Sequence, residues 1–434
     1  MSLNRIYGVQ ARLWVQLQQN MVQLTTRTMA SDSRRWVSSG TTNHEKLAPK
    51  TVPKHDWNRA VSEAVKIVGY PASFLSLLQR DEIALHLRNL ASSNHPLLEM
   101  AKDMVSTDKT NLQPYGLIVL LLSKAVGHAA TVADLERDKC DGVLQLQREL
   151  AEITEMARSG HLMHHGFVNL PPLGEIGGKL NASEMAYGNK IALLIGDYLL
   201  GKSLLQLADL RNQHVFELIS SAMRDMTEAS FFGERDQQNN PVPSRPARDT
   251  FTGGEHGKLN FGDAEDNRQP FNVAGVIGNP EDEWALRHIL GTGSLLGKSC
   301  QGALMLAKQP EDLQRHGYMF GKHISLAWQA GHDLEPFSSA QLPLGEKFSL
   351  VSAPVLFHLA YDPSLYDEIE KGLESIENVD FAKVHAEVRN GPGLEQTHEL
   401  HKKYSIAALM VLNELPASDA RTALENIILA MQDI

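Results

Sequence analysis

The sequence predicts an all-α fold, a bundle of ten or more helices around a central cavity. From about Trp57 onward, apolar residues recur at intervals of three and four, the spacing that places them on one face of an α-helix. Alternation of apolar and polar residues is scarce, and aromatic residues make up only 6% of the 434 residues, while Leu and Ala are frequent. Amphipathic helices bury their apolar faces against one another, so this pattern favours a helical bundle.

Three stretches carry the helical pattern most clearly. The middle of the chain has a stripe formed by Leu150, Ile153, Ala157, Gly160 and His164. A longer stripe, which predicts one long helix, is formed by Ile289, Gly293, Leu296, Cys300, Ala303 and Ala307. Two closing helices are expected on either side of Pro416, because a proline inside a helix interrupts its hydrogen bonds.

The N-terminus differs in composition from the rest of the chain. Arginines are interleaved with apolar residues over the first 35 positions, and no acidic residue occurs before Asp32. This pattern is typical of a mitochondrial transit peptide. We therefore expect residues 1–40 to be a transit peptide or disordered and the protein to lie in the mitochondrial matrix, the alternative being a merely disordered basic terminus.

The helical domain is expected to span residues 57–434, with one interruption. From about residue 233 to residue 275 the sequence is rich in Gln, Asn, Pro, Gly, Asp and Arg and has few apolar anchors. Such a segment cannot offset the entropy of its ordering by burying apolar surface. We expect it to be a polar, mobile insertion.

Charge, cysteines and hydropathy exclude several classes of protein. The net charge of -11 is spread along the chain, which argues against nucleic acid as a partner. Two cysteines, Cys140 and Cys300, can form neither a disulfide framework nor a zinc cluster by themselves. The longest apolar run, Ile191 to Ala208, carries Asp197 and Lys202 and is shorter than the ~20 apolar residues of a membrane helix, so no transmembrane segment is expected.

Four segments, in order, resemble the trans-polyprenyl diphosphate synthases. The segment from Tyr187 to Ala208, YGNKIALLIGDYLLGKSLLQLA, is similar to that family's helix G-N-K-x-A-x-L-x-G-D-F-L-L. The segment from Phe320 to Phe337, FGKHISLAWQAGHDLEPF, is similar to its G-x-x-L-G-x-A-F-Q-x-x-D-D-x-x-D-F segment. The stretches FSLVSAPVLFHLA and AALMVLNELPASDARTALENIILAM resemble the helices that follow. The resemblance implies the isoprenoid-synthase-type bundle.

In active members of that family, two aspartate-rich motifs on facing helices hold Mg²⁺ ions, which bind an allylic diphosphate. Departure of the diphosphate leaves an allylic cation, which isopentenyl diphosphate attacks, so that the chain grows by one C5 unit. Magnesium requires hard oxygen ligands and near-octahedral geometry, which is why the motifs are built from carboxylates.

This sequence departs from both motifs. The residues at the six expected aspartate positions are His165, Gly166, Asn169, His332, Asp333 and Pro336. One carboxylate therefore remains where the family has six. At ~4 Å and an effective dielectric constant near 20, each lost contact between a carboxylate and a cation forfeits about 4 kcal/mol before desolvation. We expect no catalytic residue, no metal site and no bound cofactor in this chain.

The positions that bind diphosphate through basic residues are also changed. The uncharged residues that replace the family's bases are Leu112, Gln113, Tyr115 and Gly291. Two independent losses favour the absence of catalysis over an unusual variant of it.

The resemblance therefore implies a non-catalytic, regulatory subunit. It would form a hetero-oligomer, such as a heterotetramer, with a catalytic polyprenyl diphosphate synthase that supplies the Mg²⁺ site, and the complex would make a long, decaprenyl-type side chain for ubiquinone. One alternative is an independently active prenyltransferase with a non-standard metal site built on the histidines and Asp333, since His161, His164 and His165 have a helical spacing that suits a transition metal. The other alternative is an isoprenoid-binding carrier.

Overall fold

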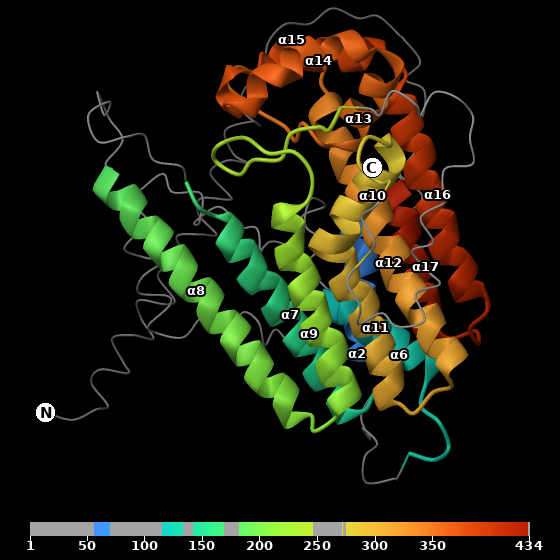
Figure 1. Cartoon of the computed structure of the whole chain (residues 1–434). Helices are drawn as coiled ribbons and strands as arrows, with labels where there is room; N and C mark the ends of the chain where they lie inside the picture. The colour runs from blue at the N-terminus through green and yellow to red at the C-terminus, as the bar shows by residue number, and fades with distance from the viewer. Residues whose placement is uncertain are drawn as a thin grey trace, which may run out of the picture. The chain divides into compact units, whose positions relative to one another are not determined.

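The protein is an all-α bundle, as the sequence predicts (Figure 1). The computed structural model describes residues 56–69, 115–132, 142–168, 182–245, 271 and 275–432. These residues contain no β-strand, only an isolated antiparallel bridge between Arg235 and Pro241. The predicted transit peptide at residues 1–40 and the predicted site residues Leu112, Gln113 and Asn169 lie outside the described residues.

The described α-helices share one compact unit of the chain, Pro53–Ile434. In chain order they are α2 (Trp57–Val68), α6 (Tyr115–Val126), α7 (Gln145–His165), α8 (Ala182–Asp209), α9 (Gln213–Glu228), α10 (Pro280–His288), α11 (Ser294–Leu306), α12 (Glu311–Leu334), α13 (Ala353–Tyr361), α14 (Tyr366–Ile369), α15 (Phe381–Asn390), α16 (Gly393–Asn413) and α17 (Asp419–Gln432). The short 3-10 turns are η2 (Ala229–Phe231), η4 (Glu335–Phe337), η5 (Pro363–Leu365), η6 (Glu370–Leu373) and η7 (Ile376–Asn378). A single π-helical turn, η3 (Ile289–Gly293), joins α10 to α11.

Side-chain caps fix where several helices begin. Asn212 accepts a hydrogen bond from the backbone N–H of Val215 at the start of α9, and Asn279 accepts one from Asp282 at the start of α10. Such caps satisfy backbone donors that have no partner within the helix. The predicted break near Pro416 is confirmed, because α16 ends at Asn413 and α17 begins at Asp419.

The main core is built around α6, α11 and α12. The apolar residues Leu117 to Leu122 of α6 are at most 1% exposed, as expected for a helix that is apolar on all sides. Helix α12 packs along α11 on one side and α16 on the other, and α17 packs against α2 and α6 (Figure 1). The predicted stripe from Ile289 to Ala307 is buried along this core, although η3 interrupts the α-helical geometry within it.

Glycines allow two of the helix pairs to approach closely. A Cβ atom at Gly321 of α12 would lie 2.7 Å from the carbonyl oxygen of Leu296 and 2.8 Å from the Cα of Gly297, both in α11. A Cβ atom at Gly160 of α7 would lie 3.0 Å from the carbonyl oxygen of Gly196 in α8. The backbones of each pair are therefore nearly in contact, and larger residues would separate the helices.

Helix α8 is the most apolar long helix. Among the described residues it alone, over Ser183–Asp209, is long and apolar enough to cross a membrane by length and composition, and 39% of its most apolar 18-residue window is buried inside the protein. It packs along α7 and touches α9 at its C-terminal end (Figure 1). A single helix of this kind that packs in a bundle is no clear transmembrane segment.

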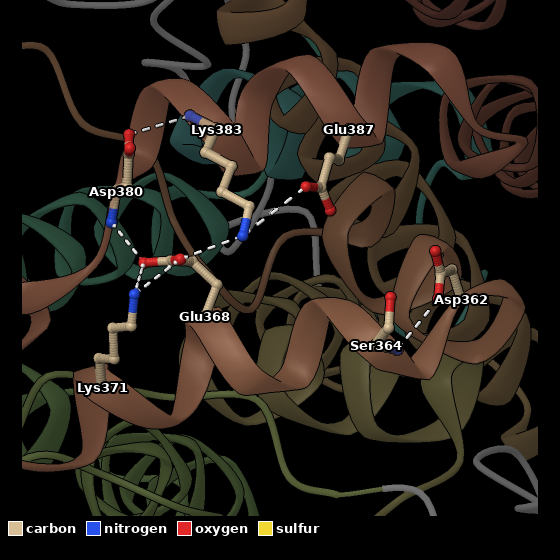
Figure 2. Close-up of polar contacts among 7 residues, drawn as sticks. All are labelled: Asp362, Ser364, Glu368, Lys371, Asp380, Lys383 and Glu387. Atoms are coloured by element: carbon tan, nitrogen blue, oxygen red, sulfur yellow. Dashed lines mark hydrogen bonds and ion pairs between the residues drawn. The ribbon is translucent and has the colours of Figure 1, made fainter.

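A second, smaller core lies under α13, α14 and α15. Its buried residues include Phe337, Val355 and Val384. At its surface, the Glu368 carboxylate of α14 accepts hydrogen bonds from the Lys371 and Lys383 ammonium groups and from the backbone N–H of Asp380 (Figure 2). Glu368 is 5% exposed, so these three donors compensate a nearly buried charge and join α14 to α15.

The start of the predicted polar insertion is anchored to the helical unit. Val242 is 1% exposed and belongs to the second core, and the Ser244 hydroxyl donates to Glu283 of α10 over 3.0 Å. Asp236 accepts a hydrogen bond from the backbone N–H of Ile376. Residues 246–270 and 272–274, the greater part of the predicted insertion, lie outside the described residues.

The contact between α11 and α12 predicts a strong effect of one methyl group. Gly321→Ala should lower the free energy of unfolding by about 1–3 kcal/mol, because the new Cβ meets backbone atoms that cannot move aside. Gly201→Ala in α8 is the control, since no atom lies within 4 Å of its Cβ position, and it should leave stability unchanged or raise it by about 0.5–1 kcal/mol. Urea unfolding followed by circular dichroism measures both. Equal stabilities of the two variants would contradict the close approach of the helices.

Candidate functional site

The two sequence positions that correspond to the aspartate-rich motifs lie at helix ends. His165 is the last residue of α7, and Gly166 ends that helix, its N–H donating to the carbonyl of Met163 over 3.1 Å. His332 and Asp333 lie in the last turn of α12, and Pro336 follows in η4. The described positions are thus at the ends of long helices, where a site for a polar ligand could be built.

The one retained carboxylate is engaged within the fold. Asp333 is 5% exposed. Its Oδ2 accepts hydrogen bonds from the Trp284 indole Nε1 at 2.7 Å and from the Ala353 backbone N at 2.8 Å. Its Oδ1 accepts one from Gln329 Nε2 at 2.8 Å. These bonds connect the end of α12 to α10 and to the start of α13, so Asp333 is a structural anchor of three helices.

The neighbours of Asp333 make other contacts. His332 points to the surface with its side chain 51% exposed, and its Nδ1 lies 3.0 Å from Glu335 Oε2. This hydrogen bond raises the pKa of His332 above its usual value. The Pro336 carbonyl accepts a hydrogen bond from His385 Nε2 at 3.2 Å. Glu335, which sequence reasoning did not single out, is therefore the partner of a histidine.

The first motif position forms a pair of histidines. His165 Nε2 lies 3.0 Å from His161 Nε2, one turn earlier in α7. Burial, followed by the nearby His165, lowers the pKa of His161 to about 3, and burial together with Arg235 lowers the pKa of His165. His164 is directed to α8 instead, with its Nε2 3.2 Å from Asp197 Oδ1. The structure brings two of the three candidate histidine ligands together and separates the third.

These contacts do not fit a Mg²⁺ cluster. Magnesium is bound by carboxylates and other hard oxygen ligands, whereas His161 and His165 offer nitrogens, His161 near the cationic Arg158 and His165 near the cationic Arg235. In the part of the chain that the structure describes, no three His, Cys, Asp or Glu side chains are grouped so that they could hold a metal ion. Asp333 would have to exchange its three protein donors for a cation.

The two described positions of the lost bases differ, because Tyr115 is packed in the core and Gly291 borders open space. Tyr115 is 3% exposed, and its hydroxyl lies 3.4 Å from the Ser325 hydroxyl of α12. The Arg158 guanidinium of α7 lies 4.8 Å from the centre of the Tyr115 ring. Gly291 is in the π-helical turn η3, with no atom within 4 Å of its Cβ position. Arg158 is therefore a cation beside Tyr115. The sequence motifs did not indicate it, because it belongs to a different helix.

A buried ion pair lies between α9 and α11. Lys298 and Asp225 are both 0% exposed, and Lys298 Nζ lies 2.5 Å from Asp225 Oδ2 and 2.9 Å from the Ser221 hydroxyl. The Ser294 hydroxyl also donates to Asp225, and Arg224 Nη2 approaches its other oxygen at 2.7 Å. A buried lysine of this kind requires several compensating partners, which the cluster provides. No motif in the sequence indicates it.

The arrangement of helices is that of prenyl diphosphate synthases. A geranylgeranyl pyrophosphate synthase from Lactobacillus brevis superposes with a TM-score of 0.54 over 86% of this chain and 96% of its own, at 16% identity. A decaprenyl diphosphate synthase from Rhodobacter capsulatus superposes with a TM-score of 0.51 over 87% of this chain and 97% of its own, also at 16% identity. At these identities the likeness defines the fold class.

Sequence comparison defines the family. The chain is 36% identical to the all-trans-polyprenyl-diphosphate synthase PDSS2 of Mus musculus over 391 residues, 87% of this chain and 88% of that protein. It is 30% identical to the mitochondrial hexaprenyl pyrophosphate synthase of Saccharomyces cerevisiae over 315 residues, 66% of this chain and 63% of that protein. No protein-family model matches the sequence. The chain belongs to the trans-polyprenyl diphosphate synthase family, which confirms the resemblance seen in its motifs.

The contacts of Asp333 predict a structural role for this residue. Asp333→Ala should lower the free energy of unfolding by on the order of 3 kcal/mol, because it leaves buried donors of Trp284 and Ala353 without an acceptor. His332→Ala is the adjacent control and should change it by less than about 1 kcal/mol, since it removes only an exposed pair. Denaturant unfolding measures both. Wild-type stability of Asp333→Ala would show that its carboxylate is free for another role.

Proposed function

We propose that this chain is a non-catalytic subunit of a heteromeric long-chain polyprenyl diphosphate synthase, which makes the ubiquinone side chain from isopentenyl diphosphate and an allylic diphosphate. The observation that carries the proposal is the state of Asp333, the only carboxylate left at the six expected aspartate positions. It is buried and accepts three hydrogen bonds from the fold. The family relationship supports polyprenyl diphosphate synthesis as the process in which the subunit takes part.

The chemistry of the complex then belongs to the partner. Ionisation of an allylic diphosphate requires cations that neutralise the departing group, and in this family those cations are Mg²⁺ ions held by carboxylates. Here, His161 and His165 face each other at the first motif and His332 faces Glu335 at the second. A catalytic polyprenyl diphosphate synthase subunit supplies the Mg²⁺ site and the diphosphate-binding bases, and this chain contributes its surface and stability.

Location and assembly follow from the same proposal. The Arg-rich, acid-poor N-terminus and the mitochondrial relative from yeast both support a position in the mitochondrial matrix. The relationship to PDSS2 supports a hetero-oligomer, with a heterotetramer as the proposed form. Neither nucleic acid nor a membrane span is part of the proposed assembly.

The proposal predicts the outcome of a reconstitution assay. The isolated chain should show no Mg²⁺-dependent elongation of farnesyl diphosphate by isopentenyl diphosphate, because its motif positions lack the necessary ligands. The mixture with the active synthase of the same organism should elongate at least tenfold faster than that synthase alone. Radiolabelled isopentenyl diphosphate incorporated into extractable product measures both rates. Turnover by the isolated chain would instead support the independently active enzyme with a non-standard site built on the histidines and Asp333.

Ligand-induced stabilisation offers a second measurement. Adding Mg²⁺ and inorganic diphosphate should leave the melting temperature of the isolated chain unchanged within error, since a ligand stabilises a protein only to the extent that it binds the folded state. The same addition should raise the melting temperature of the active synthase, which serves as the control. A concentration-dependent rise for the isolated chain would contradict the loss of the metal-diphosphate site.

A further inference from the structure

Two histidines meet near the end of α7, at a place that the proposed function does not use. His161 and His165 are one helical turn apart, and their Nε2 atoms lie 3.0 Å from each other. The two rings are nearly perpendicular, with an interplanar angle of 83° and 4.5 Å between their centres. His161 is half-buried and His165 is exposed, so solvent reaches the pair. Two histidines four positions apart on a helix can bind one metal ion together, as in the zinc-binding pattern H-E-x-x-H.

The third histidine of this segment does not belong to the pair. His164 points to α8, where its Nε2 lies 3.2 Å from Asp197 Oδ1 and 3.3 Å from the carbonyl oxygen of Leu193. A metal ion at the pair would therefore have two protein ligands, and water would complete its coordination. This agrees with the absence, within the described ranges, of any group of three His, Cys, Asp or Glu side chains that could hold a metal ion.

The separation of the two nitrogens selects the geometry of the ion. Imidazole nitrogens bind a metal such as zinc at about 2.0–2.1 Å, so two of them are about 2.8–3.0 Å apart at a right angle and about 3.3–3.4 Å apart at the tetrahedral angle. The observed 3.0 Å corresponds to the right angle. Square-planar or tetragonal coordination is typical of Cu²⁺ and Ni²⁺, whereas zinc sites are mostly tetrahedral.

Metal binding requires one proton to change its place. The hydrogen bond between the two Nε2 atoms contains a proton that one of the two rings carries. A metal ion needs the lone pair of both Nε2 atoms, so this ring has to adopt the tautomer with its proton on Nδ1. Rotation about χ2, which is a soft torsion in histidine, then directs both lone pairs to one point. The ion thus takes the place of the proton between the rings.

Two guanidinium groups near the pair determine which ions it can bind. Arg158 lies near His161, and Arg235 lies near His165. Their repulsion acts on every dication alike. The bond to an imidazole nitrogen is strongest for the late ions of the first transition row, and Mg²⁺ prefers oxygen ligands. Only ions that gain much from bonds to nitrogen can offset this repulsion, which again favours Cu²⁺ and Ni²⁺.

We propose that His161 and His165 form a bidentate site for a late divalent transition metal ion of square-planar or tetragonal geometry, such as Cu²⁺ or Ni²⁺. The site differs from the Mg²⁺ cluster of active relatives in its ligand atoms and in its residues, because His161 lies outside the aspartate-rich motif. It departs from the expectation that this chain holds no metal. It goes beyond the proposed function, since it requires neither the partner nor turnover.

A titration of the full, tag-free chain with Ni²⁺, followed by calorimetry, tests the site. His161→Gln and His165→Gln should each lower the affinity of the tightest site by at least about tenfold, because each removes one of its two ligands. Glutamine is polar and a good helix former, so both variants should keep the helical circular dichroism of the wild type. His164→Gln is the matched control in the same turn and should bind Ni²⁺ like the wild type, since His164 is directed to Asp197.

Two further measurements separate ligation from a merely structural role of the pair. Ni²⁺ should raise the melting temperature of the wild type and of His164→Gln, but of neither pair variant, because a ligand stabilises the folded state only where it binds. One equivalent of Cu²⁺ should give an axial electron paramagnetic resonance spectrum with splitting from two nitrogens. Either pair variant should lose the splitting from one of them.

Three outcomes would overturn the site. Equal Ni²⁺ affinity of the wild type and of both pair variants would show that the pair does not bind the ion. An equal loss of affinity in His164→Gln would assign the ion to a different set of histidines. The intense visible absorption of tetrahedral Co²⁺, seen with the wild type and lost in the pair variants, would contradict the geometry derived from the distance between the nitrogens.

Discussion

The hydrogen bonds to Asp333 are the interaction on which the functional interpretation depends. They tie the last turn of α12 to the indole of Trp284 in α10 and to the first backbone N–H of α13. To serve as a metal ligand, this carboxylate would have to abandon donors that are themselves buried, and each unsatisfied buried donor costs about 1–3 kcal/mol. The Asp333 carboxylate thus stabilises the fold and is also the group that metal binding would require. The two roles compete for the same oxygen atoms.

Close helix contacts and internally compensated charges stabilise the described bundle. Glycine contacts still hold α11 against α12 and α7 against α8. Between α9 and α11, Lys298 donates to Asp225 and to the Ser221 hydroxyl, and the Ser294 hydroxyl and Arg224 donate to Asp225, so the buried pair is compensated within the protein. Charges that are satisfied within the protein are unavailable to a diphosphate.

The helices could be predicted because their causes are local. Periodic apolar residues, Pro416 and the motif order predicted the bundle and the break between α16 and α17. The partners of Asp333 could not be predicted, because Trp284 lies 49 residues away and becomes a neighbour only through packing. The same holds for Lys298 and Asp225, which are 73 residues apart. The turn η3 was also missed, since a π-helical turn keeps the apolar stripe that predicted a continuous helix.

The crossing of α7 and α8 gives the end of the first motif helix a role in packing. A Cβ atom at Gly196 would collide with the His164 ring, and the next residue, Asp197, is paired with that histidine. The end of α7 therefore packs directly against α8 and fixes its position. Substitutions at His164 or Gly196 would therefore displace α8 together with the end of α7, so the position of α8 depends on the packing of the first motif region.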